Sequence, residues 1–203
     1  MTWEVLSIIG TIAFAISGAV IAMEEEYDIL GVYTLGIVTA FGGGAIRNLL
    51  IGVPVSALWN QSMYFTIAFL TITAVFLFPS NLLKHWNRWG NLTDAIGLSA
   101  FAIQGALFAV RMQHPISAVI VAAVLTGSGG GIVRDLLAGR KPLVFKEEIY
   151  AVWAILIGAV IGMGFAQSAW QLYALFILVT LLRVCSYIYK WKLPNKQLKS
   201  LAK

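Results

Sequence analysis

Long apolar stretches separated by short polar segments dominate this chain, with no alternation between core-facing and solvent-facing positions. Seven stretches approach the roughly 20 residues that a helix needs to cross a bilayer. They cover about residues 5–23, 29–52, 62–79, 92–110, 115–139, 149–167 and 170–190. The pattern predicts an all-α integral membrane protein with seven transmembrane helices, forming a single membrane domain over residues 1–203.

A glycine motif occurs twice within these stretches, 87 positions apart. Residues 42–52 read GGGAIRNLLIG and residues 129–139 read GGGIVRDLLAG, with seven of eleven positions identical. The same offset relates residues 8–23 to residues 95–110, where nine of sixteen positions match without a gap. A constant offset across two separate segments indicates that the chain contains a duplication.

The duplication predicts an inverted repeat. We place repeat 1 at residues 5–79, a linker at 80–91 and repeat 2 at 92–167, followed by a helix at 170–190 and a basic tail at 191–203. Each repeat carries three of the expected spans, so the second copy enters the membrane from the opposite side. The two halves are then related by a pseudo-two-fold axis in the membrane plane.

Composition supports the membrane assignment, and charge adds an orientation. Apolar residues make up 60% of the chain and charged residues 11%, whereas soluble domains carry about 25% charged residues. With the N-terminus outside, ten lysines and arginines fall in inside loops and in the tail, against Arg111 alone outside. The positive-inside rule therefore predicts an outer N-terminus and a cytoplasmic C-terminus. The net charge of +5 is explained by topology, so we expect neither nucleic acid nor a soluble partner.

Each glycine triplet weakens its helix, because glycine lowers helix stability by about 1 kcal/mol relative to alanine. The triplets are Gly42, Gly43, Gly44 and Gly129, Gly130, Gly131. An interrupted helix exposes carbonyl oxygens, which are ligands suited to K⁺ or Na⁺. We expect such a cation site at the backbone carbonyls of Phe41, Gly42, Ser128 and Gly129. Alternatively, the glycines only allow two helices to pack closely.

Arg47 and Arg134 follow the triplets by about one helical turn, inside apolar stretches where charge is disfavoured. One interpretation places them beside a pore, where they set its electrostatics or gating and pair with Asp94 or Asp135. The other interpretation is snorkelling, in which each guanidinium reaches the membrane interface. Asn48 and Asp135 occupy equivalent positions but differ in charge, so the two halves of the site are electrically unequal.

Further polar residues lie within the spans and are candidates to line a pore. They are Ser17, Gln104, Thr39, Thr126 and Ser128. Each either faces a hydrated path or forms a hydrogen bond within the helical bundle. Four carboxylates at residues 24–28 either enrich cations at a pore mouth or are simply solvated. The sequence lacks a Cys/His cluster, a nucleophile with an assigned base and a phosphate-binding loop, so we expect neither an enzyme nor a cofactor.

Together these features resemble the prokaryotic trimeric intracellular cation (TRIC) channel family, which is also labelled a glycine transporter domain family. The resemblance covers about residues 5–190 and is carried by two motifs of the form GGGxxR[D/N]. GGGIVRD at 129–135 fits the family pattern, whereas GGGAIRN carries Asn48 where an aspartate is expected.

The resemblance implies a homotrimer in a bacterial or archaeal inner membrane, in contact with lipids, with one pore inside each protomer. It implies that the second and fifth spans are kinked at the glycine triplets and line the pore together with the first and fourth spans. It implies passive conduction of monovalent cations, K⁺ above all and also Na⁺. The runner-up interpretation is a secondary transporter of glycine or another small amino acid.

Overall fold

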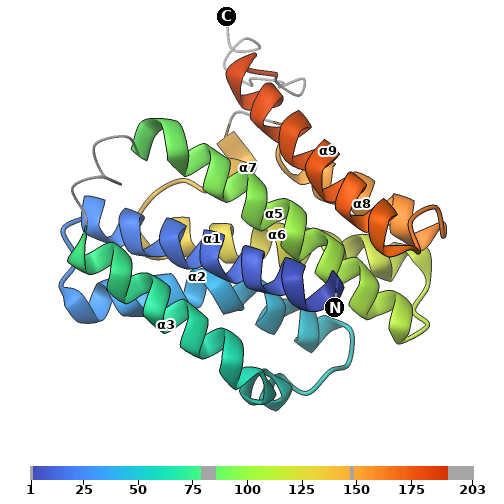
Figure 1. Ribbon diagram of the computed structural model, residues 1–203, viewed down its shortest axis with the longest axis horizontal. Helices are drawn as coiled ribbons and strands as arrows, with labels where there is room; N and C mark the ends of the chain where they lie inside the picture. The colour runs from blue at the N-terminus through green and yellow to red at the C-terminus, as the bar shows by residue number, and fades with distance from the viewer. Residues whose placement is uncertain (1, 79–85, 147–148, 192–203) are drawn as a thin grey trace, which may run out of the picture.

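The computed structural model describes residues 2–78, 86–146 and 149–191, and every regular element within them is helical (Figure 1). The α-helices are α1 (Thr2–Glu24), α2 (Ile29–Leu50), α3 (Ser62–Leu77), α5 (Trp86–Arg111), α6 (Ile116–Leu137), α7 (Leu143–Lys146), α8 (Ala151–Gly162) and α9 (Ala169–Ile188). A 3₁₀-helix, η1 (Val55–Gln61), leads directly into α3. Residues 80–85 of the expected linker and residues 192–203 of the expected tail lie outside the described residues, whereas residues 86–91 of the linker form the start of α5.

Six helical segments in the described residues are long and apolar enough to cross a membrane, rather than the expected seven. The exception is the stretch 149–167, where α8 has only 12 residues. Such a helix is about 18 Å long, well short of a hydrocarbon core of about 30 Å. Although the apolar run continues, the helix ends at Gly162, and Gly164 follows with a φ of 81°. The structure is therefore an all-helical membrane protein with six clear spans.

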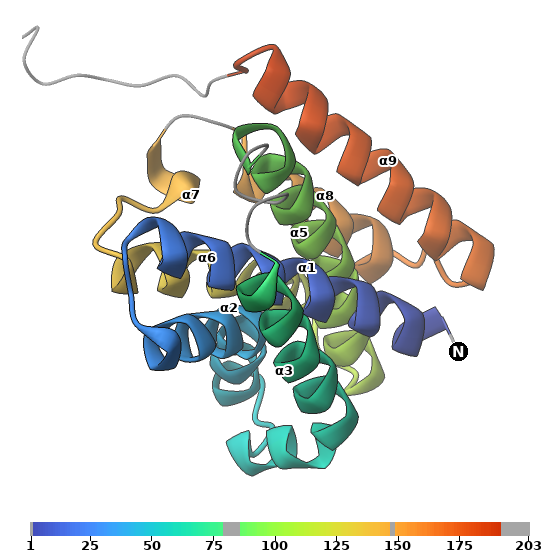
Figure 2. The ribbon, with the colours of Figure 1, turned by 60° about the vertical axis from the view of Figure 1, so that its left-hand side comes forward.

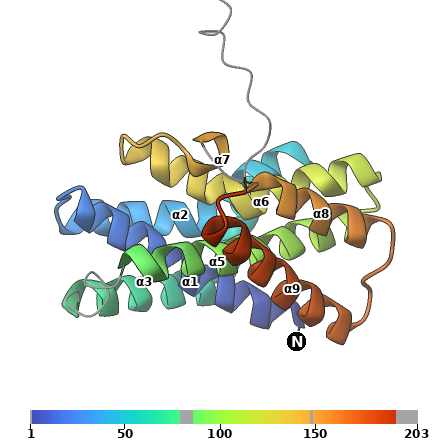
Figure 3. The ribbon, with the colours of Figure 1, turned by 90° about the horizontal axis from the view of Figure 1, so that it is seen from above.

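The centre of the molecule is built from four helices, α1 and α2 of the first repeat and α5 and α6 of the second. In Figure 3, α2 and α6 form a layer above α1 and α5 in the picture. Helix α3 packs against α1 and α2, and α8 packs against α6 and α5, so each repeat covers its own half of the centre. Helix α9 packs mainly on α5, and Figure 2 shows it on the side of the bundle opposite α3.

Local sequence sets where the central helices begin and end. The Asp28 carboxylate accepts a hydrogen bond from the backbone N–H of Gly31 at 2.8 Å and so caps the N-terminus of α2. Helices α2 and α6 both stop just before a glycine, Gly52 and Gly139, with φ values of 77° and 69°. This left-handed conformation favours glycine and ends a helix. The two stops are 87 positions apart, as the duplication requires.

Candidate functional site

Helices α2 and α6 approach each other at their glycine triplets. A β-carbon added to Gly43 would lie 2.7 Å from the carbonyl oxygen of Thr126 and 3.0 Å from the backbone nitrogen of Gly130. A β-carbon added to Gly130 would collide with the carbonyl oxygen of Thr39. No side chain fits at either position, so the triplets bring two helix backbones into direct contact. This is the close-packing alternative for the glycines.

The expected break at the triplets is absent, because helical structure runs without interruption over Ile29–Leu50 and Ile116–Leu137. None of the six triplet glycines has a positive φ. In an intact helix the carbonyls are hydrogen-bonded within the helix. The cation site predicted at the carbonyls of Phe41, Gly42, Ser128 and Gly129 therefore lacks the interrupted backbone on which it was based.

Two phenylalanines fill the centre between α1 and α5. Phe14 packs against Gly97, and Phe101 packs against Gly10. The two contacts are equivalent, because the offset of 87 relates Phe14 to Phe101 and Gly10 to Gly97. The ring centroids of Phe14 and Phe101 lie 5.2 Å apart in a T-shaped arrangement, and both side chains are buried. Neither phenylalanine was predicted from the sequence as a site residue. Their shared offset of 87 was the available signal.

Polar cavities lie on both sides of this phenylalanine pair. Along α1, Ser7 and Thr11 line the first cavity, Phe14 follows, and Ser17 and Glu24 line the second. Helix α5 runs the other way, with Asp94 at the second cavity and Phe101 and Gln104 at the first. We call them the Arg47 cavity, lined also by Arg47, and the Arg134 cavity, lined also by Arg134. An apolar constriction thus separates two polar compartments.

The Arg134 cavity has a volume of about 240 Å³ and is lined by an arginine whose charge is paired with carboxylates. The Arg134 guanidinium lies 2.7 Å from the Asp135 carboxylate and 3.2 Å from the Asp94 carboxylate. It also donates a 2.5 Å hydrogen bond to the Ser17 hydroxyl. Only 2% of Arg134 is exposed, so snorkelling is wrong for this residue. One cation is held between two carboxylates inside the protein.

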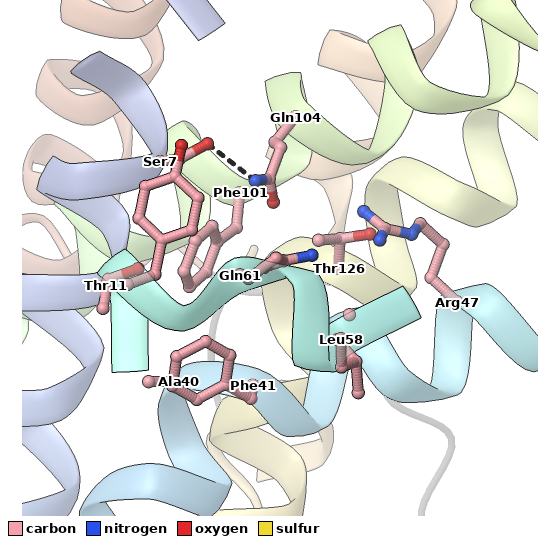
Figure 4. Close-up of a pocket in the computed structure, with 12 residues that line it drawn as sticks. Ser7, Thr11, Ala40, Phe41, Arg47, Leu58, Gln61, Phe101, Gln104 and Thr126 are labelled. Carbon is pink, nitrogen blue, oxygen red and sulfur yellow. Dashed lines mark hydrogen bonds between the residues drawn. The ribbon is translucent and has the colours of Figure 1, made fainter. Parts of the chain in front are cut away.

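The Arg47 cavity is smaller and differently charged (Figure 4). Arg47 is likewise 2% exposed, so it does not snorkel either. Its guanidinium donates hydrogen bonds of 3.0 and 2.6 Å to the side-chain oxygen of Asn48 and lies 4.4 Å from the centre of the Phe108 ring. The Gln104 amide donates a 2.7 Å hydrogen bond to the Ser7 hydroxyl across the cavity wall. Asn48 and Phe108, which contact the Arg47 guanidinium, are both uncharged.

The two cavities are chemical variants of one arrangement. The offset of 87 relates Arg47 to Arg134, Asn48 to Asp135, Ser7 to Asp94, and Ser17 to Gln104. Each arginine is hydrogen-bonded to the residue that follows it in the chain. Each cavity is also lined by one residue of α1 and one of α5 that the repeat makes equivalent. Ser7 was missed from sequence, although its equivalence to Asp94 could have identified it. Both carboxylates, Asp94 and Asp135, pair with the arginine of the second repeat, Arg134.

Most of the remaining predicted polar residues donate hydrogen bonds to backbone carbonyls of their own helix. The hydroxyls of Thr39, Thr126 and Ser128 each donate a 2.6 Å hydrogen bond to the carbonyl four residues earlier. Thr126 also lines the Arg47 cavity. Gly44 lines the same cavity, while Gly42 has room for a side chain near Val133. Among the described residues, no group of three or more His, Cys, Asp or Glu is arranged to hold a metal ion.

An ion-pair cluster lies at the mouth of the Arg134 cavity. Arg140, which follows α6, donates hydrogen bonds to Glu25 at 2.5 Å and to Glu24 at 3.0 Å, at the end of α1. Arg140 and Glu24 both line the cavity. Two of the four carboxylates in the acidic segment 24–28 are therefore paired with a cation across the cavity mouth.

A helical membrane protein with two related halves that meet through glycines, and with polar cavities on either side, has the architecture of an inverted-repeat channel or transporter. The sequence model of the family described as "Glycine transporter" matches residues 4–80 and 91–167, two stretches that begin 87 positions apart. The chain belongs to this family.

Relatives in several bacteria are described as membrane proteins. The UPF0126 membrane protein YvgT of Bacillus subtilis (strain 168) is 74% identical over 196 residues, which cover 97% of each chain. The UPF0126 inner membrane protein YadS of Escherichia coli (strain K12) is 35% identical over 158 residues, which cover 77% of this chain and 75% of the relative.

Solved structures similar to this chain are TRIC channels. One, from work on conductance through TRIC cation channels, is 35% identical with a TM-score of 0.84 and covers 98% of both chains. A prokaryotic TRIC channel crystallised in 0.5 M KCl is 34% identical with a TM-score of 0.85, covering 94% of this chain and 98% of that one. The orthologue from Rhodobacter sphaeroides is 32% identical with a TM-score of 0.84, over 93% and 98% of the two chains.

These matches confirm the resemblance predicted from the glycine motifs. They extend over almost the whole chain, and the similar fold is that of channels rather than enzymes. The protein is therefore a multi-pass membrane protein without enzymatic activity.

Proposed function

We propose that the protein is a passive channel for monovalent cations, K⁺ and also Na⁺, with one path through each protomer of a homotrimer. The observation that carries the proposal is the line of two polar cavities separated by the Phe14–Phe101 pair, within a fold similar to TRIC cation channels. The path runs between α1, α2, α5 and α6. Gly43 and Gly130 hold α2 and α6 together beside it.

The charges that line the Arg134 cavity support conduction of cations. The Arg134 cavity is lined by two acids, Asp94 and Glu24, and two bases, Arg134 and Arg140, so its charges are balanced and a cation entering it meets carboxylate oxygens. Asp94 Oδ2 is buried and has no hydrogen-bond partner in the described part of the chain. That oxygen is a ready ligand for a dehydrating cation. We place Arg47, Asn48, Arg134, Asp135 and Asp94 as the residues that set pore electrostatics.

The proposed orientation places the Arg47 cavity outside and the Arg134 cavity inside, in a prokaryotic inner membrane. It follows from the positive-inside rule with an outer N-terminus. The rings of Phe14 and Phe101 fill the space between the cavities. Conduction therefore requires these rings to move, and their pairing defines a closed state.

The test is electrical. Purified protein is fused into a planar bilayer under a KCl gradient, and then under mixed KCl and NaCl. We expect unitary steps that reverse near the K⁺ equilibrium potential and persist with Na⁺. The family description names glycine, so the same preparation is assayed for glycine uptake in proteoliposomes. A silent bilayer together with saturable glycine uptake would overturn the channel and favour the transporter.

A further inference from the structure

We propose that the Arg47 cavity is a binding site for one monatomic anion, with chloride as its physiological occupant. The site goes beyond the proposed function, because a passive cation path does not in itself require a bound anion. It is formed by side chains of both repeats, with Ser7 on α1, Arg47 on α2 and Gln104 on α5.

The first observation is a buried charge that has no counter-charge among the described residues. Arg47 is 2% exposed and remains cationic in proteins because its guanidinium is not deprotonated. Its Nε and Nη2 atoms donate to Asn48, while Nη1 is buried with no hydrogen-bond partner among the described residues. Buried charges are normally paired, because burying an isolated charge is costly. Arg47 therefore has one free donor and one unbalanced positive charge.

The second observation is the cavity into which this charge faces. Figure 4 shows the Arg47 side chain directed toward the other lining residues. The walls carry the hydroxyls of Tyr64 and Thr11 and the amide of Gln61, all of which can donate a hydrogen bond. Among the described residues that line the cavity, none is an acid. A pocket of donors around a cation selects an anion.

The third observation is size. The cavity volume is about 20 Å³, and a site needs about 10–15 Å³ on this measure to hold one water. One ion of similar size fits, whereas a carboxylate or a phosphate needs space for several atoms. The cavity therefore favours a halide, and chloride is the commonest halide in biological media.

The repeat explains why an anion is required in one half only. In the Arg134 cavity, Asp94 and Asp135 supply negative charge within 3.2 Å of the guanidinium. At the equivalent positions, Ser7 and Asn48 are neutral. We infer that a mobile chloride takes the role in the first half that the Asp94 carboxylate has in the second. A bound anion would give the Arg47 guanidinium a counter-charge, as Asp94 and Asp135 do for Arg134.

The effect on transport rests on the proposed function. With chloride bound, the positive charge beside the path is cancelled, and a cation meets a lower barrier in the Arg47 cavity. Replacing chloride by a large anion such as methanesulfonate should then reduce K⁺ conductance of the unaltered protein. Binding itself does not depend on ion flow, so it can be measured whether or not the protein conducts.

The experiment is direct detection of bromide, which substitutes for chloride and scatters anomalously. Crystals grown in NaBr should show an anomalous peak within hydrogen-bond distance of Arg47 Nη1. In solution, chloride NMR line broadening by the purified protein reports the same exchange. The decisive variant is Ser7→Asp, which places in repeat 1 the carboxylate that repeat 2 already accommodates. Repulsion should weaken halide binding by about tenfold or more.

The matched control is Ser56→Asp, which adds the same charge at an exposed position on η1. It should bind bromide like the unaltered protein. Asn48→Asp serves as a second test variant, because aspartate occupies the equivalent position 135. A peak absent from the cavity, a water in its place, or binding unchanged by both cavity variants would overturn the proposal. Halide binding without any current would leave the anion site standing and reject the channel instead.

Discussion

Gly43 of α2 and Gly130 of α6 lie in backbone contact, at equivalent positions of the two repeats. A β-carbon on Gly43 would lie 3.0 Å from the backbone nitrogen of Gly130. The contact joins the two halves beside the path, between the Arg47 cavity and the Arg134 cavity. Any side chain at this crossing has to push two helices apart, so the contact fixes the spacing of the central helices.

Gly130→Ala should destabilise the protein more than alanine at another position of the triplets. Its methyl group would meet the carbonyl oxygen of Thr39, a backbone atom that moves only with α2. Overpacking of this kind costs about 1–3 kcal/mol of unfolding free energy. The measurement is thermal unfolding in detergent, followed by intrinsic fluorescence.

Gly42→Ala is the control for this substitution. A β-carbon there would meet its nearest atom, a methyl group of Val38, at an ordinary 3.8 Å. We expect a neutral effect or a gain of up to about 1 kcal/mol from the higher helix propensity of alanine. Equal losses for both variants would mean that flexibility of the triplets, and not the close contact, is what their glycines provide.

Arg134→Gln should be far more damaging than Arg47→Gln. The first change leaves two buried carboxylates, Asp94 and Asp135, without their cation. Removing one partner of a buried pair costs about 3–5 kcal/mol. The second change removes a buried charge whose partners among the described residues, Asn48 and Phe108, are neutral, so little stability should be lost.

A double variant isolates the ion pair from other effects of the substitution. Adding Asp94→Asn to Arg134→Gln should recover part of the lost stability, since one uncompensated charge is removed. Denaturant-induced unfolding of the two single variants and the double variant gives the coupling. Additive losses would show that the pairing of Arg134 with Asp94 contributes nothing.

The duplication and the helical class could be predicted because both are written in linear patterns. A fixed offset of 87 and apolar runs of membrane length need no knowledge of side-chain direction. The same offset identified Arg47 and Arg134 as equivalent, and polarity alone marked Asp94 and Asp135. Which acid faces which arginine could not be predicted, because helices that are apolar all round carry no periodic signal of their rotation.

Three features of the site and fold were established only by the three-dimensional structure. Ser7 is a small polar residue near a helix end; its offset of 87 from Asp94 marks it as a candidate, and the crossing of α1 and α5 places it beside the Arg47 cavity. Phe14 and Phe101 are two aromatics among many apolar neighbours. The apolar run at 149–167 gave no sign that α8 would end at Gly162, because the run continues beyond it.

Arg140→Gln should raise K⁺ conductance at low ionic strength. The substitution frees the carboxylates of Glu24 and Glu25, which Arg140 now pairs at the mouth of the Arg134 cavity. Unpaired negative charge at a pore mouth concentrates cations there. Stability should change by less than about 1 kcal/mol, because the pair is solvent-exposed.

Ionic strength tests the cause of that increase. At about 1 M salt the screening length falls to about 3 Å, and the difference between Arg140→Gln and the unaltered channel should vanish. Lys141→Gln makes the same change of charge at the next, exposed residue, which does not line the cavity, and should have a smaller effect. A difference that persists at high salt would point to an altered structure of the mouth.

Phe101→Leu should increase the open probability of the channel. In the structure the Phe101 ring packs against Phe14 with a centroid distance of 5.2 Å, and the pair separates the two cavities. Leucine keeps the site apolar but removes the aromatic pair, a contact worth about 0.5–1.5 kcal/mol beyond its buried area. If the ring contact holds the path closed, its loss shifts the equilibrium toward the open state by up to about tenfold.

Two further variants decide whether the ring pair is the barrier. Phe14→Leu removes the same contact from the other repeat and should give the same shift, because either ring alone loses its partner. Phe69→Leu on α3 makes the identical change at an exposed position that packs on Tyr33, away from both cavities, and should leave gating unchanged. Single-channel open times in symmetrical KCl measure all three. If neither cavity-side variant differs from Phe69→Leu, the closed state is set elsewhere along the path, and the glycine crossing of α2 and α6 becomes the next candidate for the barrier.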